Sequence, residues 1–332
     1  MLNVLITELT LYTNQVMNIL RDRGFNVIIA PSTDPNNLRS LIRHADIMIV
    51  ALARISRDVI EASEKLRGII RTGTGFDNVD FNVATEKCIP VVFIPDYASR
   101  TVAEFTIALI LALAKRLIQG NKYVKTREYV NRVWANRPTD LLGIELEGKI
   151  LGIIGYGRIG RSVAQKAKAL GMRILIYDPY VDREDILREG FEPVDLDTLL
   201  KNSDFVSIHC PLTQETKHMI NEEKLKLMKP SAYIINTARG SIIDEKALYK
   251  ALVEKRIAGA AIDVYEIEPP DPKNPLLDLD NVITTPHIAF YTEESMNRLV
   301  QAIVENVLIL SKGEIPQNLA NKEILHKCRR DY

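Results

Sequence analysis

Cysteine is scarce in this chain of 332 residues. The three cysteines, Cys88, Cys210 and Cys328, lie far apart and form neither a CxxC pair nor an even disulfide framework. This usage fits a reducing compartment, so we expect a cytoplasmic protein. It also argues against a structural zinc site, and we expect no bound metal.

An excess of either charge is absent too, because 43 Lys and Arg residues balance 43 Asp and Glu residues. Without an overall field to attract phosphate backbones or anionic surfaces, we expect neither nucleic acid nor a membrane as a partner. The longest apolar run, residues 105–114, is far shorter than the ~20 residues that cross a bilayer. The first ten residues lack the basic start and cleavage site of a secretion signal.

What the sequence does contain is a repeating α/β pattern. Hydrophobic residues make up 46% of a chain whose length, at about 150 residues per domain, predicts two domains. Short apolar strands alternate with helical stretches, which predicts parallel sheets. We expect two Rossmann-like or flavodoxin-like doubly wound domains with a cleft between them. The strands are predicted at 3–7, 26–30, 46–50, 68–71, 91–94, 149–155, 173–178, 205–209, 233–237, 258–264 and 282–285.

Two helices define the predicted domain boundaries. Thr101 and Glu104 have the spacing of a capping box that opens a helix through Ile118, apolar around most of its circumference. Such a helix must be covered, either inside the core or by a second subunit, and we expect a homodimer through it. A second apolar stripe over 293–310 is long enough to return to the first domain. We therefore predict one domain from 1–99 with 291–332, and another from 100–290.

A glycine-rich turn indicates a dinucleotide site. Gly155, Gly157 and Gly160 form a GxGxxG that follows an apolar strand and opens a helix. Such glycines allow a tight turn, let a pyrophosphate approach the backbone, and let the helix pack on the strand. Asp178 ends the next strand, 18 residues after Gly160, where an acid accepts hydrogen bonds from the adenosine ribose. Its charge favours NAD over NADP.

Several separated motifs resemble those of the D-isomer-specific 2-hydroxyacid dehydrogenases, over nearly the whole chain and in the family's order. They are GTGFDNVD at 73–80, TVAE at 101–104, GYGRIG at 155–160, NTARG at 236–240, DVYEIEP at 263–269 and TPH at 285–287. The resemblance implies an NAD-dependent oxidoreductase that interconverts a 2-hydroxy acid and a 2-keto acid. It also implies a catalytic set of Arg239, Glu268 and His287.

The same three residues suit the chemistry. Reduction of a 2-keto acid needs a cation to hold the carboxylate, and the planar guanidinium of Arg239 can grip it with two charge-assisted bonds. It also needs a donor for the growing alkoxide, and an imidazole such as His287 titrates near neutral pH. Glu268 would bond the other ring nitrogen, fix the tautomer and favour the imidazolium.

The resemblance also implies further contacts. The domain over 100–290 would bind NAD, with Thr106, Arg158, Ile159, Thr237 and Asp263 around the dinucleotide. His209, which ends a strand, is expected on the nicotinamide side, whereas His44, His218 and His326 are expected to be solvated. The domain over 1–99 would bind substrate through its carboxylate-binding loop, for which the candidates are Gly73, Thr74, Gly75, Arg71, Arg54 and Arg100.

The substrate is ambiguous between 3-phosphoglycerate, glyoxylate or hydroxypyruvate, and D-lactate types. The aromatic Phe290 after His287 resembles the D-lactate type, while RTGTG at 71–75 and DVYEIEP look more like the phosphoglycerate type. Formate dehydrogenases share the fold but carry an amide where Glu268 stands. An alternative of another class is an NAD-sensing, corepressor-like binding protein, in which the cofactor closes the domains and presents a surface.

Overall fold

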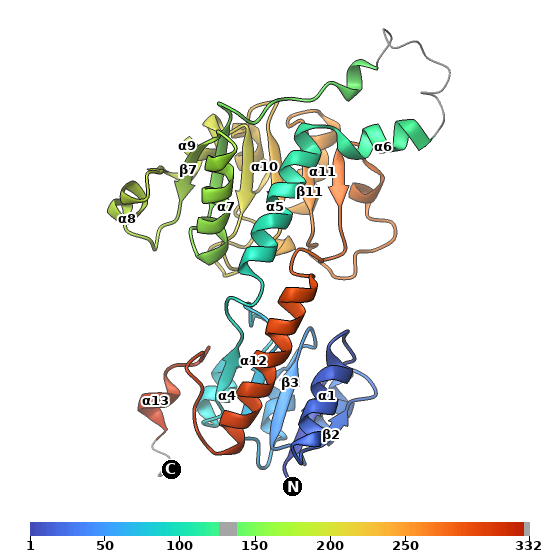
Figure 1. Ribbon diagram of the computed structural model, residues 1–332, viewed down its shortest axis with the longest axis vertical. Helices are drawn as coiled ribbons and strands as arrows, with labels where there is room; N and C mark the ends of the chain where they lie inside the picture. Colours follow the sequence, from blue (N-terminus) through green and yellow to red (C-terminus); the bar gives the residue numbers. More distant parts are fainter. Residues whose placement is uncertain (126–137, 329–332) are drawn as a thin grey trace. The chain divides into compact units, whose positions relative to one another are not determined.

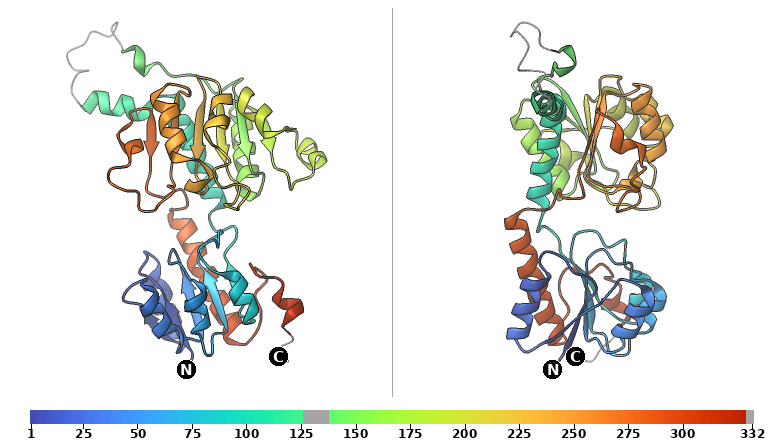
Figure 2. Two further views of the ribbon diagram at one scale, coloured as in Figure 1. Left: turned by 180° about the vertical axis from the view of Figure 1, so that it is seen from behind. Right: turned by 90° about the vertical axis from the view of Figure 1, so that its right-hand side faces the viewer.

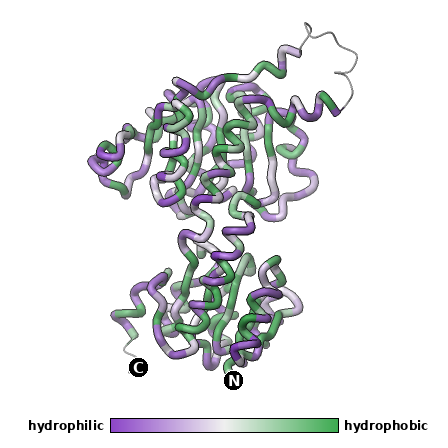
Figure 3. The backbone as a smooth tube through the Cα atoms, viewed as in Figure 1, coloured by the Kyte–Doolittle hydropathy of each residue, from purple (hydrophilic) through white to green (hydrophobic). Residues whose placement is uncertain are grey.

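The computed structural model describes residues 1–125 and 138–328, which fall into two compact units. The first unit comprises Met1–Ala98 and Tyr291–Tyr332, and the second Ser99–Phe290 (Figure 1). Both are α/β units built on parallel sheets, so the predicted fold class is confirmed for each unit. Figure 3 shows hydrophobic stretches running through both units.

The sheet of the first unit has the strand order β2-β1-β3-β4-β5, which is that of flavodoxin-like folds. All its strand pairs are parallel. Helices α1 and α12 cover one face, and α2, α3 and α4 cover the other (Figure 2). The elements are β1 (Asn3–Ile6), α1 (Thr13–Asp22), β2 (Asn26–Ile29), α2 (Pro35–Ile42), β3 (Ile47–Val50), α3 (Arg57–Glu61), β4 (Gly68–Arg71), α4 (Phe81–Glu86), β5 (Val91–Phe93), α12 (Glu293–Ser311) and α13 (Ile324–Lys327).

The sheet of the second unit has the order β12-β11-β10-β9-β6-β7-β8, with β6 and β9 adjacent. This is the Rossmann order with a seventh strand added. All strands are parallel, but β7 and β8 extend the sheet on one side of β6, whereas β9 to β12 extend it on the other. Ligands of such sheets bind beyond the carboxyl ends of the strands at this point. The strands are β6 (Ile150–Ile154), β7 (Arg173–Tyr177), β8 (Glu192–Pro193), β9 (Phe205–Ile208), β10 (Tyr233–Asn236), β11 (Gly259–Ile262) and β12 (Val282–Thr284).

Helices cover both faces of this second sheet. Helices α5 and α7 lie on one face and α9, α10 and α11 on the other (Figure 2). Successive residues of β6 alternate between the two hydrophobic cores, with Ile153 facing α7 and Ile154 facing α11. The helices are α5 (Ser99–Ala114), α6 (Leu117–Lys125), α7 (Arg158–Ala169), α8 (Arg183–Arg188), α9 (Leu196–Asn202), α10 (Glu222–Leu227) and α11 (Glu245–Val253), with short helices η2 (Thr139–Leu141), η3 (Gly240–Ile242) and η4 (Pro275–Asp278).

One local prediction was wrong, and one strand was missed. The helix predicted from Thr101 to Ile118 begins at Ser99, and it ends at Ala114 because Arg116 adopts a positive φ of 52° before α6. Thr101 therefore lies inside the helix and does not cap it. The two-residue strand β8 was not predicted, since Glu192 and Pro193 carry no strand-like apolar pattern. Across residues 1–125 and 138–328, no helix is both long and apolar enough to cross a membrane.

The expectation that the cysteines form no disulfide was also wrong. Cys88 and Cys328, 240 residues apart, are joined by a disulfide within the first unit. The returning chain brings them together, since residues 318–321 run along the edge of β5. There Ala320 N–H donates to Val91 O over 2.8 Å, and Asn321 Oδ1 accepts from Val91 N–H over 2.9 Å. Sequence spacing alone gives no sign of such a pairing.

Replacement of Cys88 by serine is expected to lower the free energy of unfolding by about 2–4 kcal/mol, because the disulfide closes a long loop in the unfolded chain. Urea unfolding with and without a reducing agent measures the difference. Cys210→Ser is the matched control, because Cys210 is unpaired. A wild-type stability that does not respond to reduction would contradict this prediction.

Candidate active site

The glycine-rich turn lies between β6 and α7, at the point where the strand order switches from one side of β6 to the other. Gly155 has φ +94°, and a Cβ there would lie 2.5 Å from the backbone nitrogen of Cys210, so the fold itself requires glycine. A Cβ on Gly157, by contrast, would meet nothing within 4 Å. Packing within the protein therefore does not require glycine at 157. The lack of a side chain there leaves room for a ligand at the start of α7. The first turn of α7, with Arg158 and Ile159, also has no side-chain cap. These residues fit a bound pyrophosphate.

Asp178 lies directly after β7 and is bonded to the glycine-rich turn. Its Oδ2 accepts from Tyr156 N–H over 2.7 Å, and its Oδ1 accepts from Tyr180 N–H over 2.9 Å. The carboxylate thus lies beside the turn on the adjacent strand, as a ribose-binding acid must. It also has a structural role that the sequence did not reveal.

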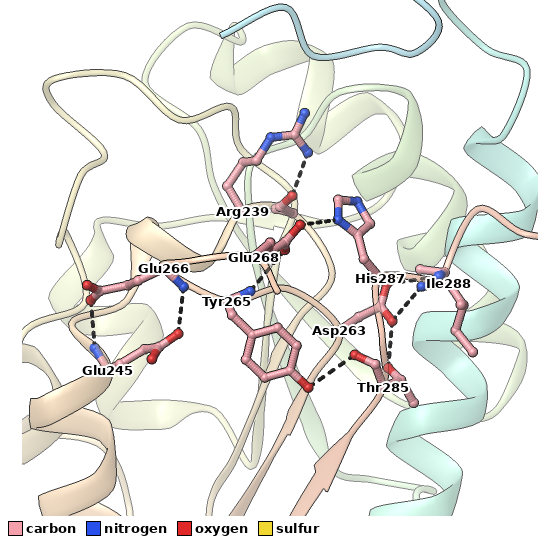
Figure 4. Close-up of polar contacts among 11 residues, drawn as sticks. Arg239, Glu245, Asp263, Tyr265, Glu266, Glu268, Thr285, His287 and Ile288 are labelled. Carbon is pink, nitrogen blue, oxygen red and sulfur yellow. Dashed lines mark hydrogen bonds and ion pairs between the residues drawn. The ribbon is translucent and has the colours of Figure 1, made fainter. Parts of the chain in front are cut away.

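His287 and Glu268 form a hydrogen-bonded pair. The distance from His287 Nδ1 to Glu268 Oε2 is 2.7 Å, and both side chains are about 30% exposed (Figure 4). Burial alone raises the pKa of Glu268, but the bond and charge of His287, the Tyr265 N–H and the charge of Arg239 outweigh it and leave that pKa below its ordinary value. Glu268 is therefore ionised at neutral pH, and its bond to Nδ1 assigns proton donation to Nε2 of His287.

Asp263 holds the loop that carries His287. Its buried carboxylate accepts from Thr285 Oγ1 over 2.6 Å, Ile288 N–H over 2.9 Å and Ala289 N–H over 2.8 Å. Its backbone carbonyl accepts from His287 N–H over 2.8 Å. Both carboxylate oxygens are thus engaged within the chain. The expected contact of Asp263 with the cofactor stays a prediction.

Arg239 extends from the turn after β10 towards the same pair (Figure 4). The buried Asn236 fixes this turn, because its Oδ1 accepts from Ala238 N–H over 3.0 Å and its Nδ2 donates to Arg239 O over 2.9 Å. Arg239 Nη1 donates to Ala238 O over 2.8 Å. The turn places the guanidinium close enough for its charge to act on Glu268. The second unit thus brings together the three predicted catalytic residues.

Other predicted cofactor contacts lie at the carboxyl ends of β9 and β10. The hydroxyls of Thr106, in α5, and Thr237 are 3.1 Å apart. His209 Nε2 lies 2.8 Å from Ser207 Oγ, and burial lowers the pKa of His209 to about 3. His209 is therefore neutral at physiological pH. Burial likewise raises the pKa of the neighbouring Cys210 to about 12, so its thiol is unreactive.

The predicted substrate loop lies after β4 in the first unit. Gly73 follows Arg71 and Thr72, and a Cβ on Gly73 would lie 1.6 Å from Arg71 Nη1, so glycine makes room for the guanidinium. Thr74 and Gly75 continue this loop. Arg54 is exposed in the loop after β3, and Arg100 is the second residue of α5, which belongs to the second unit.

Sequence reasoning missed polar residues beside this loop. Asn78 Nδ2 donates to Ala53 O over 2.8 Å, and its Oδ1 accepts from Arg71 Nε over 3.4 Å. Tyr12 OH lies 2.5 Å from Thr72 Oγ1. Asn78 belongs to the GTGFDNVD motif and could have been singled out there, but Tyr12 carries no local signal.

His218 was expected to be solvated, and its side chain is 39% exposed, but it also contacts a carboxylate. Its Nε2 lies 3.1 Å from Glu266 Oε1, two residues before Glu268 in the sequence. The contact joins loops that are far apart in the chain, so the polar context of His218 could not reveal it. Among the described residues, no cluster of His, Cys, Asp and Glu could hold a metal ion.

The chain is similar in sequence to known proteins. Residues 107–289 match the family described as D-isomer specific 2-hydroxyacid dehydrogenase, NAD binding domain. A glyoxylate reductase of Korarchaeum cryptofilum is 46% identical over 272 residues, which are 82% of this chain and 81% of the relative. A D-3-phosphoglycerate dehydrogenase of Methanocaldococcus jannaschii is 43% identical over 323 residues, 97% of this chain but 60% of the relative.

A solved structure agrees. The D-lactate dehydrogenase of Aquifex aeolicus, complexed with NAD and lactic acid, superposes with a TM-score of 0.86 at 35% identity, covering 96% of this chain and 99% of that one. Fold and site therefore define a nicotinamide-dependent oxidoreductase. The chain belongs to the D-isomer specific 2-hydroxyacid dehydrogenase family. The resemblance first drawn from the motifs is confirmed, and these comparisons give no support to the corepressor alternative.

Proposed function

We propose that this enzyme reduces a small 2-keto acid with NADH, reversibly, through Arg239, Glu268 and His287. The observation that supports this most is the 2.7 Å bond between His287 Nδ1 and Glu268 Oε2, with the charge of Arg239 acting on the same carboxylate. When bound, the nicotinamide supplies or accepts the hydride. Gly155, Gly157, Gly160, Arg158, Ile159 and Asp178 would hold the dinucleotide, with Thr106, Thr237, His209 and Asp263 nearby.

Each catalytic residue has one task. Arg239 binds the substrate carboxylate with its planar fork and orients the keto group. His287 Nε2 donates a proton to the keto oxygen as negative charge develops there, and in the reverse direction it takes the proton back. Glu268 keeps the proton of Nδ1 in place and stabilises the positive imidazolium.

The predicted domain over 1–99 with 291–332 is proposed to bind substrate, and the domain over 100–290 is proposed to bind NAD. Support for the first assignment comes from the carboxyl edge of the first sheet, where the loop of Gly73, Thr74 and Gly75 follows Arg71. Gly73 N–H donates to Arg71 O over 2.9 Å, so the N–H groups of Thr74 and Gly75 are proposed to bind the anion. Arg54 and Arg100 are proposed as further cations for substrates that carry more than one negative charge.

A substrate panel tests this function. The full chain is assayed for NADH oxidation with glyoxylate, hydroxypyruvate, pyruvate and 3-phosphohydroxypyruvate, ranked by kcat/KM. We expect turnover with at least one of these acids, and the ranking identifies the substrate type. Absence of NADH oxidation with all four would overturn the proposal.

Selectivity for NAD over NADP is proposed to come from the charge of Asp178. Replacing Asp178 by alanine together with Pro179→Arg is expected to raise the ratio of kcat/KM with NADPH to that with NADH by about tenfold or more, the value of one charge-assisted hydrogen bond. Initial rates with both cofactors measure this ratio. Asp182→Ala, which removes a carboxylate that caps α8, is the control. An unchanged ratio in the double variant would refute the role of Asp178.

A homodimer through α5 is also proposed. Phe105, Ala108, Leu111 and Ala112 form an apolar face of this helix that stays partly exposed. Sedimentation should show particles of twice the 37.5 kDa chain mass. In Leu111→Glu, the particle mass should fall to that of a single chain. Particles of 37.5 kDa alone in the wild type would dismiss the dimer.

We propose that the enzyme works in the cytoplasm, where a nicotinamide pool is available to a dehydrogenase. The Cys88–Cys328 disulfide removes the cysteine argument that first suggested this location.

A further inference from the structure

Two glutamates outside the catalytic set are bonded to each other through reciprocal hydrogen bonds. Glu266 N–H donates to Glu245 Oε1 over 2.6 Å, and Glu245 N–H donates to Glu266 Oε1 over 2.9 Å (Figure 4). Glu245 is the first residue of α11, so its N–H has no partner within the helix. Each carboxylate thus satisfies the backbone of the other residue.

This pair needs support, because two neighbouring carboxylates repel each other. His218 Nε2 lies 3.1 Å from Glu266 Oε1, and Asn274 Nδ2 donates to Glu245 Oε2 over 3.0 Å. The start of α11 adds the positive end of a helix dipole. Four residues from three separate loops and a helix start are therefore tied together, although none of them belongs to the proposed catalytic set.

The Glu245–Glu266 pair is connected to Glu268 through Tyr265. Tyr265 N–H donates to Glu268 Oε1 over 3.1 Å, while Glu268 Oε2 contacts His287. The buried ring of Tyr265 is anchored by its OH, which donates to Thr285 O over 3.2 Å. Gly240 allows the close approach of this loop, because a Cβ there would lie 1.9 Å from the carbonyl carbon of Tyr265. The backbone at 265–266 thus determines where the Glu268 carboxylate lies.

We propose that Glu245 and Glu266 are positioning residues for the Glu268–His287 pair. Their reciprocal bonds hold the loop at 265–268 against α11, so that Glu268 stays within hydrogen-bonding distance of His287. The proposal rests on the proposed function, since it assigns a task to residues behind that pair. Neither glutamate touches the reacting atoms. The function requires their oxygens as hydrogen-bond acceptors and does not require their charge.

The charged and titratable groups around Glu268 and His287 influence how the reaction rate depends on pH. Arg239 and Tyr265 act on Glu268, Asp263 lies behind the loop of His287, and His218 lies at Glu266. All of these groups are retained when Glu266 is replaced. Glu266→Gln and Glu266→Ala remove the same charge, but only the amide keeps an acceptor for Glu245 N–H. A difference between the two variants therefore reports the hydrogen bond.

The test measures NADH-dependent reduction by the full chain, with the best acid of the panel, as a function of pH. We expect Glu266→Ala to lower kcat by about tenfold, with little change in KM, because Glu268 and His287 are displaced from each other. The alkaline limb of the profile should move to lower pH, since a displaced carboxylate supports the imidazolium less well. Glu266→Gln should leave kcat and the position of the alkaline limb close to those of the wild type. Glu245→Ala, which removes the other acceptor, should behave as Glu266→Ala does.

Asp195→Ala is the matched control. Asp195 Oδ1 caps α9 by accepting from Thr198 N–H over 2.8 Å, so its loss costs a helix cap elsewhere in the same unit. We expect it to lower the unfolding midpoint and to leave the pH profile unchanged. The proposal is overturned if the profiles of Glu266→Ala and Glu245→Ala superimpose on the wild type. It is also overturned if Glu266→Gln moves as far as Glu266→Ala.

A second measurement separates this proposal from the proposed function. If the wild type reduces none of the acids, the function fails, and histidine NMR titration of the cofactor-free protein then tests the positioning role. The resonance of His287, identified by its loss in His287→Asn, should titrate at lower pH in Glu266→Ala than in Glu266→Gln. Coincident titration curves would overturn the positioning role independently of activity.

Discussion

Replacing Arg239 by lysine is expected to lower kcat/KM for keto-acid reduction by about 10²-fold or more. An ammonium group keeps the positive charge but cannot reproduce the two parallel bonds of the guanidinium to a carboxylate. The loss should appear in kcat as well as KM, because the fork also orients the keto group for proton donation by His287. Steady-state kinetics over a range of substrate concentrations measure both constants.

Arg256→Lys is the control for this substitution. Arg256 belongs to the same unit, and its exposed side chain pairs with Glu254 over 3.4 Å. Its replacement should leave kcat/KM unchanged. A fall of less than about threefold in Arg239→Lys would be no more than a surface ion pair contributes, and would remove Arg239 from the catalytic set.

Replacing Glu268 by glutamine is expected to shift the pH dependence in both directions of the reaction. Reduction requires protonated His287, and a carboxylate 2.7 Å away favours that form. Without the charge, the alkaline limb for reduction should move to lower pH. Hydroxy-acid oxidation requires the neutral imidazole, so its rise with pH should also begin at lower pH. Superimposable profiles of the two proteins would contradict the pairing.

Stability gives an independent measure of the same carboxylate. The pKa of Glu268 is lower in the folded protein than its ordinary value. Its ionised form therefore stabilises the fold above the ordinary pKa of a glutamate, and this contribution is lost as the pH falls through the lowered pKa. Denaturant unfolding at several pH values should show a shallower acid dependence in Glu268→Gln than in the wild type.

Much of the fold and the site could be predicted because the signals are local. The glycine-rich turn, its preceding strand and Asp178 lie within 30 residues, and the physical demands of a nucleotide site act within that span. Arg239, Glu268 and His287 each follow a strand of one parallel sheet, and the carboxyl ends of such strands share an edge. Strand periodicity and motifs were therefore enough to place them together.

The features that sequence reasoning missed all depend on long-range contacts. The disulfide joins positions 240 residues apart, and nothing near Cys88 or Cys328 indicates a partner. The reciprocal bonds of Glu245 and Glu266 join a helix start to a loop 21 residues later, and each glutamate alone resembles an ordinary surface residue. The break at Arg116 depends on a backbone conformation that an apolar pattern does not encode.

The segment at 318–321 has a consequence for how the first unit avoids aggregation. An open edge of a β-sheet offers unpaired backbone groups to any other extended chain. Here Leu319 forms an antiparallel bridge with Val92, and Phe93 N–H donates to Asn318 O over 3.1 Å, so the outer border of β5 is shielded. A protein truncated before residue 312 would display that border to solvent. Such a truncated form should self-associate by strand addition, even though every residue of the proposed catalytic group remains in place.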